Sequence, residues 1–322
     1  MKLRILTAKD IRICLPMSGA IEAMRSAFVQ LSSGEAIVPD RIAVSTDAGV
    51  SLFMPGYLPR EGHLAAKVVS VYGENRIRGL PVIQGVVLVL DSQTGLPLAL
   101  MDGAYLTALR TGAVGGLATE LLAVEDASVL TVFGAGPQAR TQIEAVRAVR
   151  PIQEVRLLSR PTEGARVLAD ELDGLAVGVF EDPEKAVAGA HVIVTATDSR
   201  DPVFPGGVIQ EGVHVNAIGA FTPEMAEVDG DLVVRAKVVV DLRATVMAEA
   251  GGLVRAMKDG AFSLEDIYAE LGEVVSGERP GRVSPTEITL FKSVGNAVQD
   301  VAAAGRILDV AIRKDVGTLV EV

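Results

Sequence analysis

Tryptophan is absent from this chain of 322 residues, and aromatic residues of all kinds make up only 4% of it. Because 49% of the residues are nevertheless apolar, the core must be built from valine, leucine, isoleucine and alanine. A chain of this length is too long for one typical domain and suits two.

Cysteine is nearly absent, since Cys14 is the only one. A disulfide within the chain and a metal cluster held by thiolates are therefore excluded. No apolar run reaches the roughly 18 residues of a membrane-spanning helix. The first residues mix charges with apolar side chains and lack the apolar segment of a signal peptide. We therefore expect a soluble, cytoplasmic protein.

Basic residues are fewer than acidic ones, and the formal net charge is −11. Such a surface repels phosphate backbones and anionic membranes, so we expect neither nucleic acid nor membrane as a partner. A local basic pocket remains compatible with a small anionic substrate. His63, His191 and His214 are isolated and lack metal-ligand spacing, so we expect no metal site. His191 and His214 each open a predicted strand, where a capping or surface role is expected.

Two kinds of pattern divide the chain. Residues 10–33 have helical spacing, and four β-like runs follow: "RIAVST", "VSLFMPGYL", "LAAKVVSVY" and "GVVLVLDSQTGLPLALM". The last is typical of a hairpin with its turn at residues 93–95, which indicates an antiparallel or mixed sheet. From residue 128 onward, the apolar runs "SVLTVF", "EVRLLS", "LAVGVF", "HVIVTAT", "HVNAIG" and "KVVVDL" alternate with helical stretches. Such alternation predicts a parallel sheet with helices on both faces.

We therefore predict an α/β protein with two domains. A doubly wound parallel sheet is expected in residues 116–292. A mixed α+β domain is expected from residues 1–115 and 293–322, because residues 292–314 have one long helical pattern. The glycine- and alanine-rich stretch "LTALRTGAVGGLATELL" predicts a helix that leads from one domain to the other.

The turn after the first of these buried strands has the pattern G-x-G-x-x-A over residues 134–139. Gly134 permits the tight turn, Gly136 lets the backbone approach a pyrophosphate, and Ala139 lets the helix pack closely on the strand. Pro137 and Gln138 open the helix, whose free N–H groups face the anion. Position within an alternating pattern favours a Rossmann dinucleotide site over a bare strand-to-helix turn.

The end of the second buried strand indicates which dinucleotide binds. A site for NAD usually carries an acid there, about 20 residues after the glycines, to hold the ribose 2′-hydroxyl. This chain has Ser159, Arg160 and Thr162 instead. A guanidinium can bind a 2′-phosphate bidentately, so we predict NADP(H) over NAD(H). The alternative is a solvated Arg160 that stacks on adenine and tolerates either cofactor.

Three cations lie in apolar surroundings: Arg41, Lys67 and Arg110. For each one alone, a snorkelling or salt-bridged side chain is an alternative to a functional role. Lys67 differs because "HLAAKVVSV" otherwise predicts a buried strand. A buried ammonium needs a partner, and a ligand carboxylate serves if no protein carboxylate does.

Taken together, these motifs resemble the ornithine cyclodeaminase/mu-crystallin family over essentially the whole chain. The matching stretches are "GLPVIQGVVLVLDSQTGLPLALMDGAYLTALRTGAVGGLAT", "FGAGPQA", "HVNAIGAFTPEMAEVD" and "EITLFKSVGNAVQDVA". The family includes cyclodeaminases, alanine dehydrogenases of archaeal type and cyclic ketimine reductases. The resemblance implies a Rossmann domain inserted into a substrate-binding and dimerisation domain, and it implies a homodimer.

The resemblance also implies roles for individual residues. Arg41, Lys67 and Arg110 match the catalytic positions that hold the substrate carboxylate and the reacting nitrogen. Further matches to positions that contact the cofactor are Thr111, Thr195, Thr197, Ala217, Ile218, Gly219, Ser293 and Val294.

Two departures from the cyclodeaminase pattern bear on the substrate. Cyclodeaminases have an acid two residues after the glycine of "NA[IV]G", where this chain has Phe221. They also have an acid shortly before the "MP" pair, which "VSLFMP" lacks. Both differences argue against a diamine. We expect a substrate with an uncharged side chain, in a pocket that includes Phe53, Met54, Phe221 and Gly295.

The leading hypothesis is an NAD(P)H-dependent reductase that converts pyrroline-2-carboxylate, or a related cyclic ketimine, to a cyclic amino acid. Dehydrogenation of alanine or an N-alkyl amino acid is the first alternative, and ornithine cyclodeamination is the second. A third is a mu-crystallin-like protein that binds NADPH with little turnover.

Overall fold

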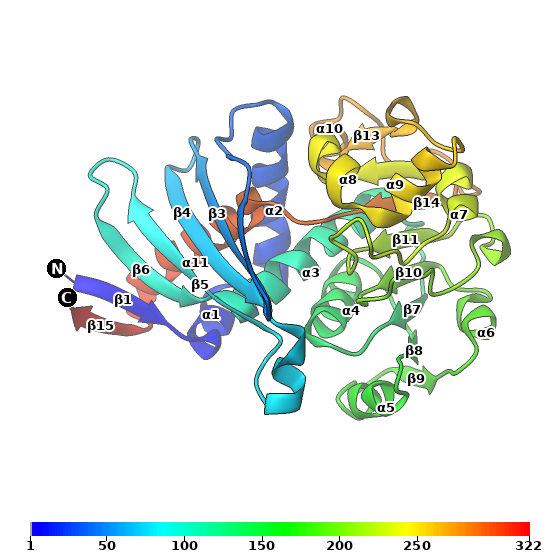
Figure 1. The fold of residues 1–322 in the computed structure, drawn as a ribbon, viewed down its shortest axis with the longest axis horizontal. Helices are drawn as coiled ribbons and strands as arrows, with labels where there is room; N and C mark the ends of the chain where they lie inside the picture. Colours follow the sequence, from blue (N-terminus) through cyan, green and yellow to red (C-terminus); the bar gives the residue numbers. More distant parts are fainter. Residues whose placement is uncertain (1) are drawn as a thin grey trace. The chain divides into compact units, whose positions relative to one another are not determined.

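The structure, a computed structural model, describes residues 2–322 (Figure 1). The chain divides into two compact units. Unit 1 contains the residues up to Arg110 together with Asn296–Val322, and unit 2 contains Thr111–Gly295. The boundaries predicted from the sequence lie five residues away at the first border and three residues away at the second.

Unit 1 is built around a seven-stranded mixed sheet with the order β15-β1-β6-β5-β4-β3-β2. Strand β1 pairs in parallel with β6, and every other neighbouring pair is antiparallel. The predicted hairpin is β5 and β6, whose turn includes Gly95 at a φ of 73°. The strands are β1 (Lys2–Leu6), β2 (Ile42–Thr46), β3 (Gly49–Leu58), β4 (His63–Val71), β5 (Ile83–Asp91), β6 (Pro97–Asp102) and β15 (Thr318–Glu321). Strands β1 and β15 were not predicted.

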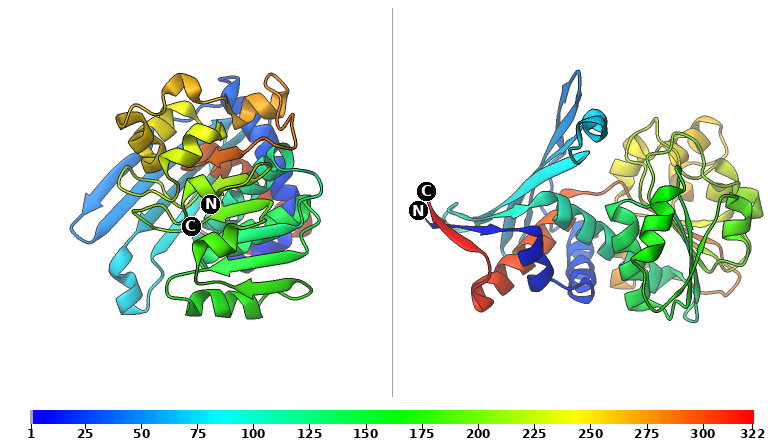
Figure 2. Two further views of the ribbon diagram at one scale, coloured as in Figure 1. Left: turned by 90° about the vertical axis from the view of Figure 1, so that its right-hand side faces the viewer. Right: turned by 90° about the horizontal axis from the view of Figure 1, so that it is seen from below.

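Helices cover one face of this sheet. Helix α11 (Ala297–Lys314) packs against β4, β3 and α2 (Met17–Ser32) (Figure 2). The single helix predicted over residues 10–33 is wrong, because α1 (Ala8–Cys14) ends before α2 begins. Pro16 lacks an N–H group and precedes the first residue of α2, and Leu15 is extended. The remaining helix is the short η1 (Gly73–Arg78).

The continuous helix predicted over residues 292–314 is also wrong at its start. Residues 289–292 form strand β14 (Thr289–Lys292), and α11 begins at Ala297. Asn296 caps α11, since its side-chain oxygen accepts a hydrogen bond from Val298 N. The helix α3 (Gly103–Leu122), which the sequence predicted, spans the border between the two units.

Unit 2 contains an eight-stranded parallel sheet with the order β13-β12-β14-β11-β10-β7-β8-β9. The six predicted strands are present as β7 (Val129–Phe133), β8 (Glu154–Leu158), β9 (Ala176–Val179), β10 (Val192–Thr195), β11 (His214–Ala217) and β12 (Lys237–Val240). Strand β14 lies between β11 and β12, and β13 (Ala269–Glu270) lies at the edge. Both were missed, β14 because its four residues run into a helix-like pattern.

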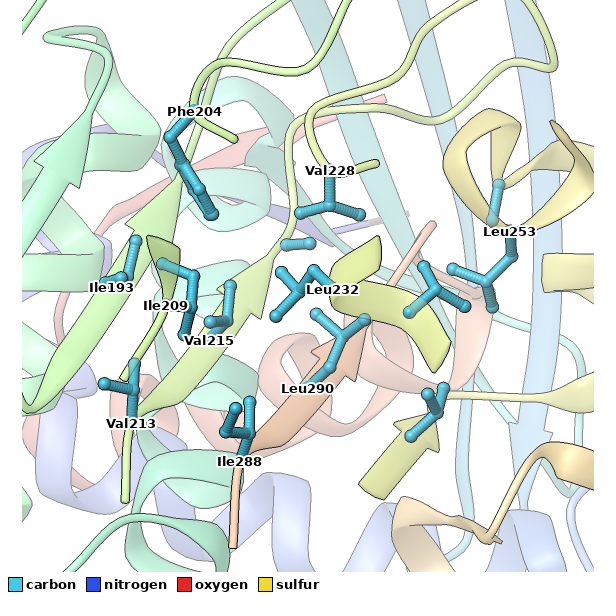
Figure 3. Packing of buried hydrophobic residues seen from close by; sticks show 14 of the residues in the cluster. Ile193, Phe204, Ile209, Val213, Val215, Val228, Leu232, Leu253, Ile288 and Leu290 are labelled. Carbon is cyan, nitrogen blue, oxygen red and sulfur yellow. The ribbon is translucent and has the colours of Figure 1, made fainter. Parts of the chain in front are cut away.

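Both faces of this sheet are buried, which explains why its strands are continuously apolar. One apolar cluster includes Val215, Leu232 and Leu290 and is drawn in Figure 3. A second includes Leu130, Ile143 and Leu157. The helices of unit 2 are α4 (Pro137–Val149), α5 (Glu163–Asp170), α6 (Pro183–Val187), η2 (Gly206–Val208), α7 (Gly230–Arg235), α8 (Arg243–Glu249), α9 (Gly251–Lys258), η3 (Leu264–Asp266) and α10 (Leu271–Ser276).

Within residues 2–322, none of the helices combines the length and the apolar character that crossing a bilayer requires. The same residues contain no group of three or more His, Cys, Asp or Glu side chains placed to hold a metal ion.

Candidate active site

Lys67 lies in the middle of β4 with only 1% of its surface exposed, which confirms the buried lysine predicted from the sequence. Its partner is a protein carboxylate. Lys67 Nζ lies 2.6 Å from Oδ2 of Asp300, on the first turn of α11. Of the two partners that the sequence left open for this ammonium, a protein carboxylate or a ligand carboxylate, the structure shows the first.

Asp300 binds a second cation. Nε of Arg110, on α3, donates to Asp300 Oδ1 over 3.1 Å, and Nη1 of Arg110 donates to Oε1 of Gln299. One buried carboxylate thus holds two cations, and the Lys67–Asp300–Arg110 cluster keeps a net positive charge. Such a cluster is suited to binding one further carboxylate.

Sequence reasoning missed Asp300, although a signal for it exists. The apolar face of the helix that became α11 includes Ala297 and Ala304, and Asp300 lies three residues after the first and four before the second. That spacing places an acid on the buried face of a helix. A buried acid needs a cation, and Lys67 was a buried cation without a known partner.

Burial dominates the protonation of Lys67. Desolvation lowers the pKa of this lysine, Asp300 acts against that shift, and the charges of Arg110 and Arg41 add to it, with the result that the pKa falls from 10.5 to about 8. At pH 7 the ammonium form prevails by about tenfold. The group therefore carries a proton near neutral pH that it can donate.

The other predicted residues of unit 1 lie on different faces of its sheet. Met54 on β3 is buried and lies directly opposite Lys67 in the β3–β4 register. Phe53 is 41% exposed and points to the other face, because side chains alternate along a strand. The structure thus brings Met54, but not Phe53, beside Lys67. Arg41 precedes β2 and is half-buried.

The glycine turn of unit 2 fits a dinucleotide. Gly134 has a φ of 109°, and a Cβ built on it would lie 2.4 Å from the carbonyl oxygen of Ala196. Gly136 is the N-cap of α4 without a side-chain hydrogen bond, and a Cβ there would meet nothing within 4 Å. The backbone at the start of α4 is therefore open to an anion. Ala139 is fully buried, as close packing of strand and helix requires.

Side-chain atoms near this turn also lack partners. Oε1 of Gln138 is buried and accepts no hydrogen bond from the part of the chain that the structure describes. The hydroxyl of Thr195, at the end of β10, is buried and unpaired within residues 2–322 as well. Buried polar atoms are usually satisfied, so both atoms are candidates for ligand contacts.

The residues after β8 are placed at the start of α5. The hydroxyl of Ser159 donates to the carbonyl oxygen of Pro161 and accepts from Ala165 N, so it is occupied locally. Arg160 is exposed, and Thr162 is the N-cap of α5 and half-buried. Of these three residues, Arg160 is therefore the one that carries a charge on the surface.

The remaining predicted cofactor residues of unit 2 gather at one edge of its sheet. Thr195 ends β10 and Thr197 lies two residues beyond it, Ala217 ends β11 and residues 218–219 follow it, and residues 293–295 follow β14. These three strands are neighbours and parallel, so their carboxyl ends meet at the same edge. Thr111 on α3 accepts a hydrogen bond on its carbonyl oxygen from Nε2 of Gln142, on α4.

The same edge holds residues that sequence reasoning missed. Glu227, Asp241 and Lys292 are charged and buried there. Phe221, the residue expected in place of a catalytic acid, packs against the apolar cluster of Figure 3. The carboxylate of Glu227 does not substitute for that acid, because backbone N–H groups already occupy it.

The whole chain matches known proteins. The profile of the ornithine cyclodeaminase/mu-crystallin family matches residues 1–315. A Delta(1)-pyrroline-2-carboxylate reductase from Bacillus cereus is 38% identical over 323 residues, which cover 98% of this chain and 99% of that protein.

Solved structures of similar proteins match the chain over essentially its whole length as well. That of Thermococcus litoralis Delta(1)-pyrroline-2-carboxylate reductase in complex with NADH and L-proline has a TM-score of 0.95 and 38% identity, and the match covers 98% of this chain and 99% of that one. An archaeal alanine dehydrogenase dimer with bound NAD has a TM-score of 0.94 and 35% identity, with coverage of 100% and 99%. The chain therefore belongs to the ornithine cyclodeaminase/mu-crystallin family.

Proposed function

We propose that the protein is a nicotinamide-dependent reductase of small α-imino acids, with pyrroline-2-carboxylate or a related cyclic ketimine as substrate. The observation that carries this proposal is the buried Lys67–Asp300–Arg110 cluster, whose net positive charge suits a substrate carboxylate. Relatives of the same family include reductases of this substrate class.

In this reaction the carboxylate of the substrate binds to Arg110 and Arg41. A bidentate contact with a guanidinium fixes the orientation of the substrate, and positioning of this kind accounts for much of the rate of a two-substrate reaction. Lys67 faces the imine nitrogen and keeps it protonated, because an iminium accepts a hydride far better than a neutral imine does. When bound, the reduced nicotinamide supplies the hydride to the C=N carbon. Hydride and proton together convert the imino acid to the amino acid.

Reversible dehydrogenation of alanine or an N-alkyl amino acid is the second candidate. It is favoured by the 35% identity with an archaeal alanine dehydrogenase over the whole chain. The same cations would hold the carboxylate of the iminium formed from pyruvate and ammonia. Ornithine cyclodeamination is disfavoured, since Phe221 and the run before Met54 supply no acid for a diamine.

One set of assays tests these candidates. The purified protein is mixed with NADPH or NADH and either pyrroline-2-carboxylate or pyruvate plus ammonia, and the loss of absorbance of the reduced nicotinamide is followed. We expect turnover with the cyclic imine to exceed turnover with pyruvate and ammonia. Release of ammonia from ornithine, with no net oxidation or reduction, would overturn the proposal. Binding of NADPH without turnover of any of these substrates would favour a mu-crystallin-like binding protein.

The cofactor is a nicotinamide dinucleotide, and NADP(H) is the form that we propose is preferred. The end of β8 lacks the acid that would hold a ribose 2′-hydroxyl and repel a 2′-phosphate. Arg160 is exposed at that strand end and can pair with the phosphate. Because the related structures hold NADH and NAD, both forms belong in every assay.

A homodimer is the proposed assembly. The face of the unit 1 sheet opposite α11 carries a row of apolar side chains, Phe53, Val68 and Val86, that are cross-strand neighbours in register. Phe53 and Val86 are each 41% exposed. A contiguous apolar face of this kind is typical of a protein–protein interface, and the related alanine dehydrogenase is a dimer.

A further inference from the structure

Glu227 is almost fully buried. Both oxygens of its carboxylate accept hydrogen bonds from the segments that follow two strands of the unit 2 sheet. Oε1 accepts from the N–H and the hydroxyl of Thr197, after β10, at 2.7 and 2.8 Å. Oε2 accepts from the N–H groups of Gly219 and Ala220, after β11, at 2.7 and 2.9 Å. One carboxylate thus joins the segments that follow two neighbouring strands.

Asp241 does the same for the segment after β14. Its Oδ2 accepts from the hydroxyl of Ser293 and from the N–H groups of Val294 and Gly295, at 2.8, 3.0 and 2.8 Å. Its Oδ1 accepts from Leu242 N. Asp241 has no exposed surface, so these bonds are what compensates the burial of its charge.

Lys292 is linked to the same strand ends as Glu227 and Asp241. It lies at the end of β14, directly before Ser293, and is 2% exposed. Its Nζ donates to the carbonyl oxygens of Ala217 and Ala220, at 3.2 and 2.5 Å. Burial lowers the pKa of this lysine, and the charges of Glu227 and Asp241 act against that shift. The ammonium thus ties the end of β14 to the end of β11.

The glycine after β11 is adapted to this arrangement. A Cβ on Gly219 would lie 2.3 Å from Thr197 O, 2.4 Å from Thr197 N and 2.6 Å from Glu227 Oε1. Backbone atoms cannot yield to such contacts, so only glycine allows the ends of β10 and β11 to approach. Ala226 and Val228 are buried on either side of Glu227, and Val228 belongs to the apolar cluster of Figure 3. The carboxylate is therefore held by a packed core.

Three buried charges are costly unless each is paired and hydrogen-bonded, and an apolar core would have served folding alone. Their bonds go to the segments after β10, β11 and β14. In a doubly wound sheet the glycine turn and the next strand bind one mononucleotide, and the second half of the sheet binds the other. Strands β10, β11 and β14 form that second half, on the nicotinamide side of the turn after β7.

We propose that Glu227, Asp241 and Lys292 are positioning residues that shape the nicotinamide end of the cofactor site. They hold the segments containing Thr197, residues 217–219 and residues 293–295 in one arrangement, so that the ring binds to a preformed surface. This inference rests on the proposed binding of a nicotinamide dinucleotide. It adds that the two halves of the dinucleotide depend on different residues, and that Glu227 affects only one of them.

The test compares a ligand that has a nicotinamide with one that lacks it. In Glu227→Gln the amide NH₂ must face N–H donors, so the bonds to either Thr197 or the residues after β11 are lost. Calorimetry with NADPH, NADH and ADP-ribose measures the effect. We expect the Kd of both reduced dinucleotides to rise by roughly tenfold, the equivalent of one charged hydrogen bond, and the Kd of ADP-ribose to change by less than about twofold.

A matched control is Glu224→Gln, which removes the same charge from an exposed position in the same loop and should leave all three affinities unchanged. Ser293→Ala is a milder second variant that removes one bond to Asp241. It should weaken NADPH and NADH selectively as well.

The possible outcomes distinguish a failure of the positioning inference from a failure of the proposed function. An equal loss of dinucleotide and ADP-ribose affinity in Glu227→Gln would show a purely structural role, and unchanged affinities would show no role. Either result overturns the inference but leaves the proposed function standing. The proposed function fails as well if the unaltered protein binds NADPH and NADH no more tightly than it binds ADP-ribose.

Discussion

At the scale of single residues, the most informative feature is the carboxylate of Asp300 between two cations. It makes a buried lysine tolerable in the middle of a strand, because an unpaired ammonium there would cost several kcal/mol. It neutralises only one of the two positive charges. The uncompensated charge is what remains for a substrate carboxylate, and the geometry of Asp300 keeps Lys67 fixed before substrate binds.

Replacing Lys67 tests its role in proton transfer. In Lys67→Met the aliphatic volume is kept and Asp300 retains Arg110. We expect kcat for the imine to fall by about 10²–10⁴, with little change in the affinity for NADPH. In the unaltered protein the rate should decline as the pH rises through about 8, because Lys67 loses the proton that it donates. The variant should lack this limb of the pH profile.

Lys185→Met is the control for that experiment, since Lys185 is exposed on α6 and forms a surface ion pair with Asp182 at 3.6 Å. It should keep the full rate and the same pH profile. A Lys67→Met protein with unimpaired turnover would eliminate the lysine from the mechanism.

Arg160 is the residue on which cofactor preference is expected to depend. Arg160→Asp places a negative charge where a 2′-phosphate would lie, so the Kd of NADPH should rise by roughly tenfold or more while that of NADH changes little. Fluorescence titration with both nucleotides measures the ratio. The matched variant Arg166→Asp, at an exposed position on α5, should leave the ratio as it is. An unaltered ratio in Arg160→Asp would mean that this strand end does not bind the phosphate.

At the scale of elements, a buried polar network joins β11, β14 and α3. Nε2 of His214 donates to Oδ1 of Asn216, whose Nδ2 donates to the hydroxyl of Thr119 on α3. Nδ1 of His214 lies 2.9 Å from the hydroxyl of Thr289 on β14. The surface or capping role expected for this histidine is wrong, because His214 has no exposed surface. His191 does take a capping role, since its Nδ1 accepts from Ser128 N and Val129 N.

This network makes stability depend on pH. Desolvation, followed by the charge of Arg282, lowers the pKa of His214 from 6.5 to about 3. Below pH 6.5 His214 is therefore protonated in the unfolded chain, whereas in the folded chain it stays neutral. Folding stability should fall as the pH drops from 6.5 towards 3, by at most about 1.4 kcal/mol per pH unit from this residue.

Urea unfolding at pH 7 and pH 5 measures the effect. In His214→Gln the side chain does not titrate, so the loss of stability between the two pH values should be smaller than in the unaltered protein, even if the variant is less stable at both. His191→Gln serves as the comparison, because His191 is half-buried and lies directly before β10 of the same sheet. An identical pH dependence in all three proteins would contradict the assignment.

At the scale of the whole molecule, the open apolar face of the unit 1 sheet predicts the assembly. Stable dimers bury roughly 1,200–2,000 Å², and a charge in the centre of such an interface is strongly disfavoured. Val86→Lys places an ammonium in the row formed with Phe53 and Val68. We expect the dimer to dissociate to monomers in light scattering after size-exclusion chromatography, with an unchanged circular dichroism spectrum.

Val234→Lys is the matched substitution, because Val234 is 55% exposed on α7 in unit 2 and lies outside this face. It should leave the molecular mass unchanged. If Val86→Lys remains a dimer, the two copies meet through a different surface.

The sequence by itself determined the helices, strands and turns whose formation depends on residues close together in the chain. Period-two and continuous apolar runs identified most strands, because they report which side chains are buried. The glycine turn was recognisable because its backbone conformation and close approach to β10 admit no side chain at Gly134. Boundaries failed where a short strand ran into a helical pattern, as at β14, or where one proline divided a helix, as at Pro16.

Only the tertiary structure decided which charges meet. Lys67 was recognisable as a buried cation, but its partner Asp300 lies on a helix near the other end of the chain, and Glu227 joins strand ends that hold no charge of their own. A periodic pattern predicts that a residue is buried, but it does not predict which residue lies beside it in the folded structure. The neighbour follows from the order and register of strands and helices, and the cost of burying an unpaired charge then requires that the partner be there.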